Sequence, residues 1–250
     1  MNQPPGPNDW QEATVVALNP ASENILQVTI RPEIWLPFRA GQHIDVRLTA
    51  EDGYQASRSY SIASAPDRGQ FYDLLIERLP DGEVSGFFHE AAEPGANLEI
   101  KGPVGGHFVW EDIADGAILA IAGGSGLAPI LSMIRHRRAA GSRVSMHLVY
   151  ATRFAAQLVA LEELRSCREG DPAFGFDVFL SREAAQSPQW HNSRISPDSL
   201  AEIVERLPTR PALVYICGSN QFAEAAISAL TFAGVPTGII RVERFGGAVQ

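Results

Sequence analysis

From Gly116 onward, short apolar runs alternate with stretches of helical spacing. The runs that indicate strands are Ala117–Ala122, Val144–Tyr150, Phe176–Leu180, Leu213–Cys217 and Ile239–Val242. The stretches that indicate helices are Ile130–Ala139, Ala155–Ser166, Ser199–Leu207 and Ala223–Ala233. An uninterrupted apolar run is typical of a strand that is buried on both faces. This alternation therefore predicts a doubly wound parallel sheet covered by helices, an α/β domain.

The first part of the chain has a different rhythm. Its strand-like runs are Thr14–Leu18, Ile25–Ile30, His43–Leu48, Ser57–Ala63, Phe71–Leu79 and Asn97–Lys101. Gly, Pro and Asp residues separate them, and one helix is expected at Ser85–Ala92. Many short strands at this spacing indicate a barrel or a sandwich, and of these we expect a six-stranded antiparallel β-barrel. We expect a barrel domain at residues 8–113 and the α/β domain at residues 114–250.

Composition excludes several classes of function. The net charge of −9 argues against nonspecific nucleic-acid binding and against a polybasic membrane patch. No apolar run approaches the length needed to span a bilayer, so no membrane insertion is expected. The start, Met1–Pro7, lacks the pattern of a signal peptide. We expect a cytoplasmic protein, since its two cysteines do not suggest a disulfide framework.

The metal-binding residue types show no metal-binding pattern. The six histidines form no ligand motif, and four clustered cysteines for an iron–sulfur centre are absent from the sequence. We therefore expect no metal site and treat the histidines as structural or surface residues.

A glycine-rich segment, Gly123–Pro129, joins the first strand of the α/β domain to its helix. Small residues allow close backbone approach, and the free N–H groups of a helix N-terminus suit a phosphate. Pro129 fits the first helical turn, where its missing N–H costs nothing. A plain strand–helix turn is the simpler interpretation, but phosphate binding at Gly124, Ser125, Gly126 and Pro129 is favoured.

Arg58-Ser59-Tyr60-Ser61 lies in a predicted strand of the barrel. Alternation places Arg58 and Tyr60 on one face and the two serines on the other. An Arg can bind a phosphate through charge-assisted hydrogen bonds, and a Tyr can stack on a flat ring. Alone, this tetrad would often be an ordinary strand.

Two shorter motifs have both structural and functional interpretations. Gly82-Glu83-Val84-Ser85 indicates a helix N-terminus, with Ser85 as the N-cap, that either is simply capped or binds an anion. Cys217-Gly218 ends a strand, where ligands of such sheets bind. A buried, inert Cys is the alternative.

Arginines follow three strands or loops of the α/β domain. Arg153 follows one predicted strand, Ser181-Arg182 follows the next, and Arg194 is nearby in sequence. Together they could hold a nucleotide phosphate, although ordinary loop charge is an equal alternative.

In this order, the motifs resemble those of the ferredoxin–NADP reductase superfamily of flavoproteins. The resemblance covers residues 10–247. Its motifs are Arg58-Ser59-Tyr60-Ser61, Gly82-x-x-Ser85, Gly102-Pro103-Val104-Gly105, Gly124-Ser125-Gly126-x-x-Pro129, Cys217-Gly218 and Glu243-Arg244-Phe245. It implies FAD on the barrel and NADPH or NADH on the α/β domain, in a reductase core without a fused iron–sulfur domain.

The resemblance also implies roles for single residues. Arg58 would bind the FAD pyrophosphate, Tyr60 would pack on the isoalloxazine and Ser61 would lie near its N5, with Ser59 beside them. Further flavin contacts would come from Ile76, Glu77, Arg78, Gly82, Val84, Ser85 and Phe245. Gly124, Ser125, Gly126 and Pro129 would meet the nicotinamide nucleotide, and Cys217 and Gly218 would border its nicotinamide. Ser61, Cys217 and Glu243 are the catalytic candidates.

The implied reaction is hydride transfer from NAD(P)H to FAD N5, followed by release of single electrons to a separate protein. A ferredoxin, a flavodoxin, or a haem or iron–sulfur oxygenase component is the expected partner, and the reductase is expected to be a monomer. Three positions depart from the family pattern: Ser219 stands where Pro is usual, Phe222 where Met is usual, and Ser125 where Thr is more frequent, which keeps the hydroxyl.

The choice of nucleotide and one alternative activity stay open. Ser181-Arg182 resembles the segment that holds the 2′-phosphate in NADPH-using relatives, and Arg153 and Arg194 would support it, so NADPH is favoured over NADH. The alternative activity is an NAD(P)H:flavin reductase that releases reduced flavin. A nucleotide-binding regulator without turnover is disfavoured by the combination of Ser61, Cys217 and Glu243.

Overall fold

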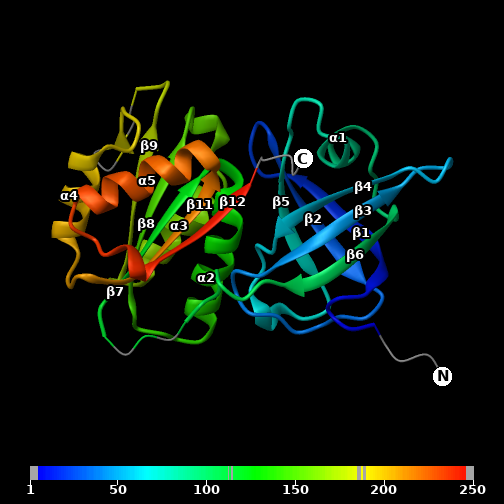
Figure 1. Cartoon of the computed structure of the whole chain (residues 1–250), viewed down its shortest axis with the longest axis horizontal. Coiled ribbons are helices and arrows are strands. Elements are labelled where there is room, and N and C mark those ends of the chain that lie inside the picture. Colours follow the sequence, from blue (N-terminus) through cyan, green and yellow to red (C-terminus); the bar gives the residue numbers. More distant parts are fainter. Residues whose placement is uncertain (1–4, 112, 114, 185–186, 188–189, 246–250) are drawn as a thin grey trace. The chain divides into compact units, whose positions relative to one another are not determined.

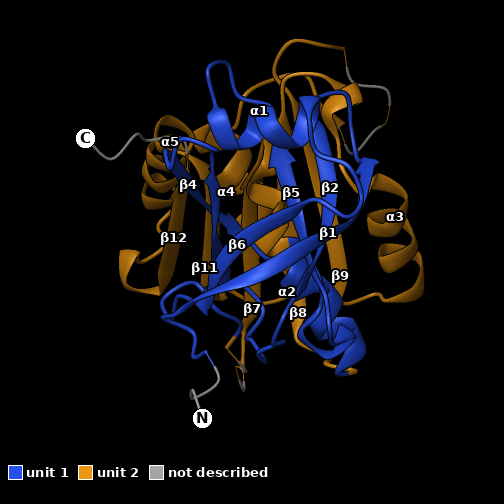
Figure 2. Ribbon diagram, turned by 90° about the vertical axis from the view of Figure 1, so that its right-hand side faces the viewer, with its two compact units in different colours: residues 1–110, 131–140 blue, residues 111–130, 141–250 orange. Residues whose placement is uncertain are grey.

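The computed structural model describes residues 5–111, 113, 115–184, 187 and 190–245. The chain divides into two compact units, which Figure 2 colours separately. Unit 1 comprises residues 1–110 and 131–140, and unit 2 comprises residues 111–130 and 141–250. The predicted boundary at 113/114 falls where residues 112 and 114 lie outside the described part of the chain.

Unit 1 contains an antiparallel sheet of the first six strands (Figure 1). These strands are β1 (Trp10–Pro20), β2 (Ile25–Pro32), β3 (His43–Thr49), β4 (Gln55–Ser61), β5 (Tyr72–Glu77) and β6 (Asn97–Val104). Their order is β4-β3-β6-β1-β2-β5. A bridge between Ile62 and Leu74 joins the two edge strands, so the sheet closes into a barrel.

Alternation of side chains along these strands forms the core of unit 1. Val28, Ile30, Ile44, Val46 and Ile100 are fully or almost fully buried inside the barrel. Helix α1 (Glu83–Glu90) contributes Val84 and Phe88 to the same core, which fixes the helix beside β4. All six predicted strands and the single predicted helix of this domain are confirmed.

The predicted N-cap of α1 is wrong by three residues. Gly82 occupies that position with extended backbone angles, and Ser85 lies inside the first turn. The Ser85 hydroxyl donates to the Gly82 carbonyl at 3.1 Å and accepts from the Leu79 N–H at 3.4 Å. Ser85 therefore stabilises the loop before the helix and does not cap the N–H groups of the first turn.

Unit 2 contains a sheet in which every described pair of neighbouring strands is parallel. Its strands are β7 (Ala117–Gly123), β8 (Ser145–Thr152), β9 (Phe174–Leu180), β10 (Trp190–His191), β11 (Pro211–Ser219) and β12 (Ile240–Phe245). The order β10-β9-β8-β7-β11-β12 changes direction at β7. Such a switch point opens a crevice at the carboxyl ends of the strands, where α/β proteins bind ligands. The predicted fold class is confirmed for both domains.

Helices connect these strands (Figure 1). They are α2 (Leu127–Ala139), α3 (Leu161–Gly170), α4 (Pro197–Arg206) and α5 (Asn220–Phe232), with 3₁₀ turns at Gly124–Gly126, Ala155–Gln157 and Thr237–Ile239, and one in unit 1 at Pro66–Arg68. No helix in the described ranges is long and apolar enough to cross a membrane.

The predicted helix Ala155–Ser166 is wrong in its first half. Residues Ala155–Gln157 form a separate 3₁₀ turn, and α3 begins only at Leu161. Ala160 adopts a left-handed conformation with φ of 55°, which ends any continuous helix. The Val159 N–H instead reaches the Tyr150 hydroxyl, so this segment is held to β8 by tertiary contacts. The sequence prediction also missed β10, which has only two residues.

Helix α2 belongs partly to each unit, and hydrogen bonds explain this division. The Ser132 hydroxyl donates to the Ser64 carbonyl at 2.6 Å, and the Arg135 guanidinium donates to the Ala63 carbonyl at 2.9 Å. These bonds hold the second part of α2 to the segment that follows β4.

A buried carboxylate organises the far edge of the unit 2 sheet. Asp177 in β9 is 3% exposed and accepts hydrogen bonds from His147 at 2.7 Å, His191 at 2.8 Å and Arg206 at 3.2 Å. These partners come from β8, β10 and the end of α4. Burial opposes ionisation of Asp177, but the bonds from the two histidines outweigh it and hold the pKa of the carboxyl well below its usual range.

Both histidines of this cluster were expected from the sequence to be structural or surface residues. In the structure both histidines have a defined partner in Asp177. His191 also stacks on Phe179, with ring centroids 4.2 Å apart. Asp177 thus joins the short strand β10 to the rest of the sheet through a side chain as well as through the backbone.

Candidate nucleotide-binding sites

In unit 1, β4 carries the Arg58–Ser61 tetrad along the edge of the sheet. The register pairs Arg58 with Val46 and Tyr60 with Ile44, both of which are buried in the core. Arg58 and Tyr60 therefore share the face that looks toward α1, as alternation predicts. The exposed Arg58 side chain donates to the Ser57 carbonyl at 2.7 Å and extends along the strand.

Tyr60 is anchored by aromatic packing. Its ring meets Phe88 of α1 edge to face, with centroids 6.4 Å apart. Burial raises the pKa of the Tyr60 phenol, and the nearby Arg58 charge only partly opposes this. Tyr60 is consequently a neutral, oriented ring at neutral pH, as a stacking platform requires.

The two serines of the tetrad lie on the opposite face of β4. The Ser59 hydroxyl donates to Asp45 at 2.5 Å, and Asp45 in turn pairs with Lys101 at 3.0 Å. Ser59 is therefore not brought together with Arg58 and Tyr60. Ser61 pairs in register with His43, whose pKa is lowered by burial. This neighbour of Ser61 had no distinguishing signal in the sequence.

The N-terminus of α1 adjoins this strand. Its first intrahelical bond runs from the Gly86 N–H to the Gly82 carbonyl at 2.6 Å, so the N–H groups of Glu83, Val84 and Ser85 precede the hydrogen-bonded ladder. A Cβ at Gly82 would lie 2.4 Å from the Ser85 hydroxyl oxygen, so a larger residue there would require the Ser85 side chain to move. Arg58 and this helix end together offer a cation and backbone donors to a phosphate.

Three candidates, Ile76 and Glu77 in β5 and Arg78 just after it, have side chains that are already engaged. Ile76 is fully buried, the Glu77 carboxylate accepts from Asn24 at 3.1 Å, and the Arg78 side chain pairs with Glu90 at 2.6 Å. The Ile76 side chain is therefore used in core packing, and those of Glu77 and Arg78 are used in contacts with neighbouring side chains. Their contribution to a ligand site would therefore come largely from the backbone.

In unit 2, the turn between β7 and α2 lies directly against the end of β11. A Cβ at Gly126 would lie 2.3 Å from the Cys217 carbonyl oxygen, closer than any side chain can approach. Gly124 has φ of 56°, a left-handed conformation that favours glycine. Two glycines therefore allow the turn to pack closely on β11. Pro129 stands in the first turn of α2, as predicted.

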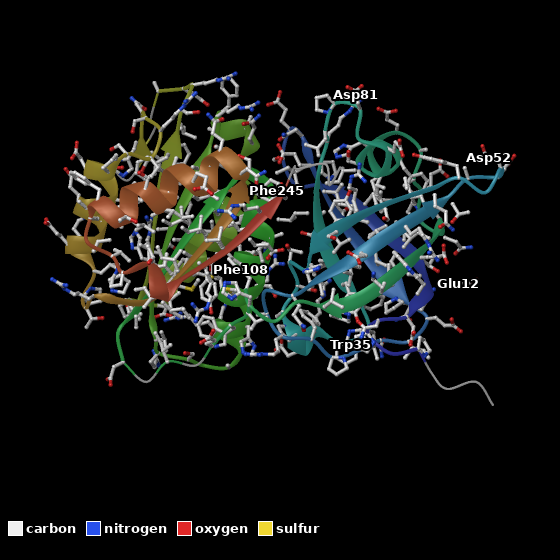
Figure 3. The ribbon with its side chains drawn as sticks, in the orientation of Figure 1. Glu12, Trp35, Asp52, Asp81, Phe108 and Phe245 are labelled. Atoms are coloured by element: carbon white, nitrogen blue, oxygen red, sulfur yellow. The ribbon has the colours of Figure 1, made fainter. Side chains whose placement is uncertain are left out.

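The catalytic candidates Cys217 and Glu243 are brought together by strand pairing. Cys217 of β11 pairs in register with Glu243 of β12. Phe245 lies two residues after Glu243, at the end of β12 (Figure 3). The Phe245 ring would lie 2.9 Å from a Cβ at Gly126, so the turn, Cys217 and Phe245 meet at one place. Burial, reinforced by the Glu243 charge, raises the pKa of the Cys217 thiol well above its usual value. Cys217 is thus a neutral thiol rather than a reactive thiolate.

Two of the departures from the family pattern, Ser219 and Phe222, contact each other in the structure. The Phe222 ring covers both Gly123 and Gly218, where a Cβ would lie 2.9 and 2.4 Å from it. The Ser219 hydroxyl accepts from the Phe222 N–H at 3.3 Å and caps α5. Phe222 therefore packs its ring over both glycines, and Ser219 caps the helix that carries it.

The predicted arginines lie at neighbouring strand ends. The Ser181 N–H donates to the Thr152 carbonyl at 3.1 Å, and the Arg182 N–H donates to the Arg153 carbonyl at 3.0 Å. The backbone segments at the ends of β9 and β8 therefore run side by side. Among the described residues, no carboxylate forms an ion pair with Arg153 or Arg182. Arg194 is exposed and lies three residues after β10. In the described part of the chain, no hydrogen bond links it to Arg153 or Arg182.

One residue of this region was missed by the sequence analysis. The Glu183 carboxylate accepts from the Ala155 N–H at 2.6 Å and so lies at the end of β8. No spacing rule signals it, because it reaches this place from the loop after a different strand.

Comparison with protein families identifies both units. Residues 17–110 match the oxidoreductase FAD-binding domain, and residues 120–227 match the oxidoreductase NAD-binding domain. The first match includes β4 and α1, and the second includes the β7–α2 turn and Cys217.

Individual proteins agree with these matches. Ferredoxin–NADP reductase B of Sorangium cellulosum is 29% identical, over 94% of this chain and 97% of its own length. The reductase component DmpP of the phenol 2-monooxygenase of Pseudomonas sp. is also 29% identical, over 96% of this chain but 66% of its own length. The chain thus spans about two thirds of that oxygenase reductase.

A solved structure of a reductase has a similar fold. The cytochrome P450 reductase GcoB of Amycolatopsis superposes with a TM-score of 0.83 at 25% identity, covering 95% of this chain and 70% of its own. With adjacent FAD- and NAD-binding domains that span most of its length, the chain belongs to the ferredoxin–NADP reductase superfamily and is an NAD(P)H-dependent flavoprotein reductase.

Proposed function

We propose that this chain oxidises NADPH at the unit 2 site and passes the electrons through FAD held by unit 1 to a separate iron–sulfur or haem protein. The observation that carries this proposal is the fit of Gly126 against the Cys217 carbonyl, which gives the β7–α2 turn the close packing that a dinucleotide site needs. FAD supplies the change from two-electron to one-electron chemistry when it is bound.

The residues of unit 1 fit an FAD molecule. Arg58 and the N–H groups of Glu83–Ser85 provide a cation and aligned donors for the pyrophosphate. Tyr60 provides a fixed neutral ring for the isoalloxazine. We assign Ser61 a hydrogen bond near the reacting nitrogen, either to orient the flavin or to supply a proton there.

In unit 2, Gly124, Ser125 and Gly126 would hold the phosphates of the nucleotide at the N-terminus of α2. Cys217 and Gly218 would border the nicotinamide, where the neutral thiol fills space without adding charge. Glu243, which pairs with Cys217 in register, is the candidate for moving a proton at this site.

NADPH is the proposed donor because Arg153 and Arg182 present two guanidinium groups at adjoining strand ends. A 2′-phosphate carries the charge that they would bind. Glu183 lies at the same edge, but its carboxylate accepts the Ala155 N–H. The ratio of kcat/KM for NADPH to that for NADH tests this assignment, and a strong preference for NADH would reject it.

Replacing Arg182 with alanine should lower kcat/KM for NADPH by about tenfold to 100-fold, the value of a charged hydrogen bond. The same constant for NADH should change less than about twofold, because its ribose lacks the phosphate. Steady-state kinetics with both donors measures this. Arg210→Ala is the control, since it removes an exposed guanidinium that precedes the amino end of β11. An equal loss with both donors would remove Arg182 from phosphate recognition.

Replacing Arg58 with alanine should weaken FAD binding by about tenfold to 100-fold, because the pyrophosphate loses its charged partner. Titration of the apoprotein with FAD, followed by quenching of flavin fluorescence, gives the Kd. Arg31→Ala is a suitable control, since Arg31 is an exposed arginine on β2. If Arg58→Ala binds FAD as tightly as the wild type, Arg58 does not contact the phosphates.

The electron acceptor is proposed from the relatives. The similar oxygenase reductase components act with oxygenases, as their names state, and a ferredoxin, a flavodoxin or such a component is therefore the class to test. We further propose that the chain works as a monomer in the cytoplasm. Reduction of each class of acceptor protein by NADPH and this enzyme, followed in a stopped-flow spectrometer, would identify the partner.

A further inference from the structure

A tyrosine in the β3–β4 hairpin reaches across to the first residue of α1. The Tyr54 hydroxyl lies 2.9 and 3.1 Å from the two carboxylate oxygens of Glu83. The hairpin holds this tyrosine in place, since its N–H donates to Asp52 at 3.0 Å and its carbonyl accepts from the Ala50 N–H at 2.8 Å. Figure 3 labels Asp52 at the tip of this hairpin and Asp81 in the loop before α1.

Tyr54 is 58% exposed, more than any other large hydrophobic residue in the described part of unit 1. It contributes little to the core, so the packing of the barrel does not require it. Its hydroxyl contact, by contrast, fixes the position of one carboxylate.

Glu83 occupies the end of α1 at which the proposed FAD site lies. The N–H groups of Glu83, Val84 and Ser85 are not used by the helix, whose first bond starts at Gly86. A carboxylate in the first helical turn is attracted to such donors, just as a phosphate is. Glu83 and the FAD pyrophosphate would therefore compete for the same donors and repel one another.

The charges around Tyr54 connect it with the rest of the site. The hydrogen bond that the Tyr54 hydroxyl donates to Glu83 raises the pKa of Tyr54, and the positive charge of Arg58 opposes this rise. Arg58 is thus near enough to influence the Tyr54 phenol. The charges of Glu83 and Arg58 therefore both act on Tyr54, and all three residues lie in unit 1.

We propose that Tyr54 and Glu83 form a latch that sets how tightly unit 1 holds FAD. This inference rests on the proposed function, since it assumes that FAD binds at Arg58 and α1. Glu83 weakens binding through its charge, and Tyr54 limits this effect by holding the carboxylate on the hairpin side. Loss of the Tyr54 hydroxyl frees the carboxylate to occupy the helix N-terminus.

A double-mutant cycle on the full-length apoprotein tests the latch through the Kd for FAD, measured by quenching of flavin fluorescence. Glu83→Gln should tighten FAD binding by about threefold to tenfold at low salt, and added salt should reduce the gain. Tyr54→Phe should weaken binding by about twofold to fivefold. In the Glu83→Gln background, Tyr54→Phe should change the Kd less than about twofold, since no charge remains to be held.

Two controls separate the latch from general effects. Riboflavin lacks both phosphates, so its Kd should be the same in all four proteins. Glu90→Gln removes the same charge from the opposite end of α1, where Glu90 pairs with Arg78, and should leave the Kd for FAD unchanged. If Glu90→Gln tightens binding as much as Glu83→Gln does, net charge is responsible and the latch is rejected.

The outcomes distinguish this inference from the function on which it rests. If the folded wild-type protein does not quench FAD fluorescence, the proposed FAD site is wrong and the latch falls with it. If the wild type binds FAD but all four proteins of the cycle have the same Kd, the latch alone is rejected. An equal effect of Tyr54→Phe in both backgrounds would likewise reject it, because the two residues would act independently.

Discussion

Replacing Gly126 with alanine is expected to lower NADPH oxidation by about 100-fold or more while FAD stays bound. The new methyl group would lie 2.3 Å from the Cys217 carbonyl oxygen, so either the β7–α2 turn or the end of β11 must move. A displacement of about 1 Å at a reacting centre costs on the order of 100-fold in rate. Stopped-flow measurement of flavin reduction, with the FAD content determined separately, checks this result.

The matched control is Gly170→Ala at the end of α3. A Cβ at that position would have no atom within 4 Å, and its backbone does not need a positive φ. This variant should reduce FAD at the wild-type rate. Normal flavin reduction in Gly126→Ala would mean that the approach of the turn to β11 is not needed for catalysis.

Replacing Asp177 with asparagine is expected to destabilise the protein by about 3 kcal/mol at neutral pH, because it removes a buried charge whose partners stay in place. The amide group also turns a donor toward groups that already donate, from His147, His191 and Arg206. Urea unfolding, followed by circular dichroism, measures the loss. Glu162→Gln is the control, since Glu162 pairs with Arg165 on the surface and should contribute no more than about 1 kcal/mol.

The pH dependence of this effect has a definite sign. The pKa of Asp177 is lower in the folded protein than its ordinary value of 3.8, so the folded state favours the ionised form. The stabilisation is then complete above about pH 5 and is lost as the pH falls toward the folded-state pKa. The difference between the wild type and Asp177→Asn should therefore shrink on acidification below about pH 5. A difference that stays constant or grows would contradict the proposed ionisation.

The parts of the fold that the sequence predicts are those with strong local patterns. The apolar run Ala117–Ala122, bounded by glycines, leaves little choice but a buried strand, and it is confirmed as β7. The six barrel strands were likewise marked by alternation and turn residues. Cys217 and Glu243 could be expected to meet, because parallel strands end at one edge of a sheet.

Features set by tertiary contacts escaped prediction. The helix expected from Ala155 begins six residues later, because the Tyr150 hydroxyl holds Val159 and Ala160 turns the backbone. The Asp177 cluster joins residues 30 and 14 positions apart, so no local pattern announces it. The Tyr54–Glu83 contact likewise links a hairpin to a helix that begins 29 residues later. Local periodicity carries no information about such pairs.

The most direct test of the account is an anaerobic titration of the FAD-loaded protein with NADPH. If unit 1 holds FAD and unit 2 supplies hydride from NADPH, the visible flavin absorbance should bleach in proportion to added nucleotide and be complete near one equivalent. Addition of an oxidised acceptor protein should then restore it. Retention of the full flavin absorbance in excess NADPH and in excess NADH would contradict the central claim that this chain is a reductase.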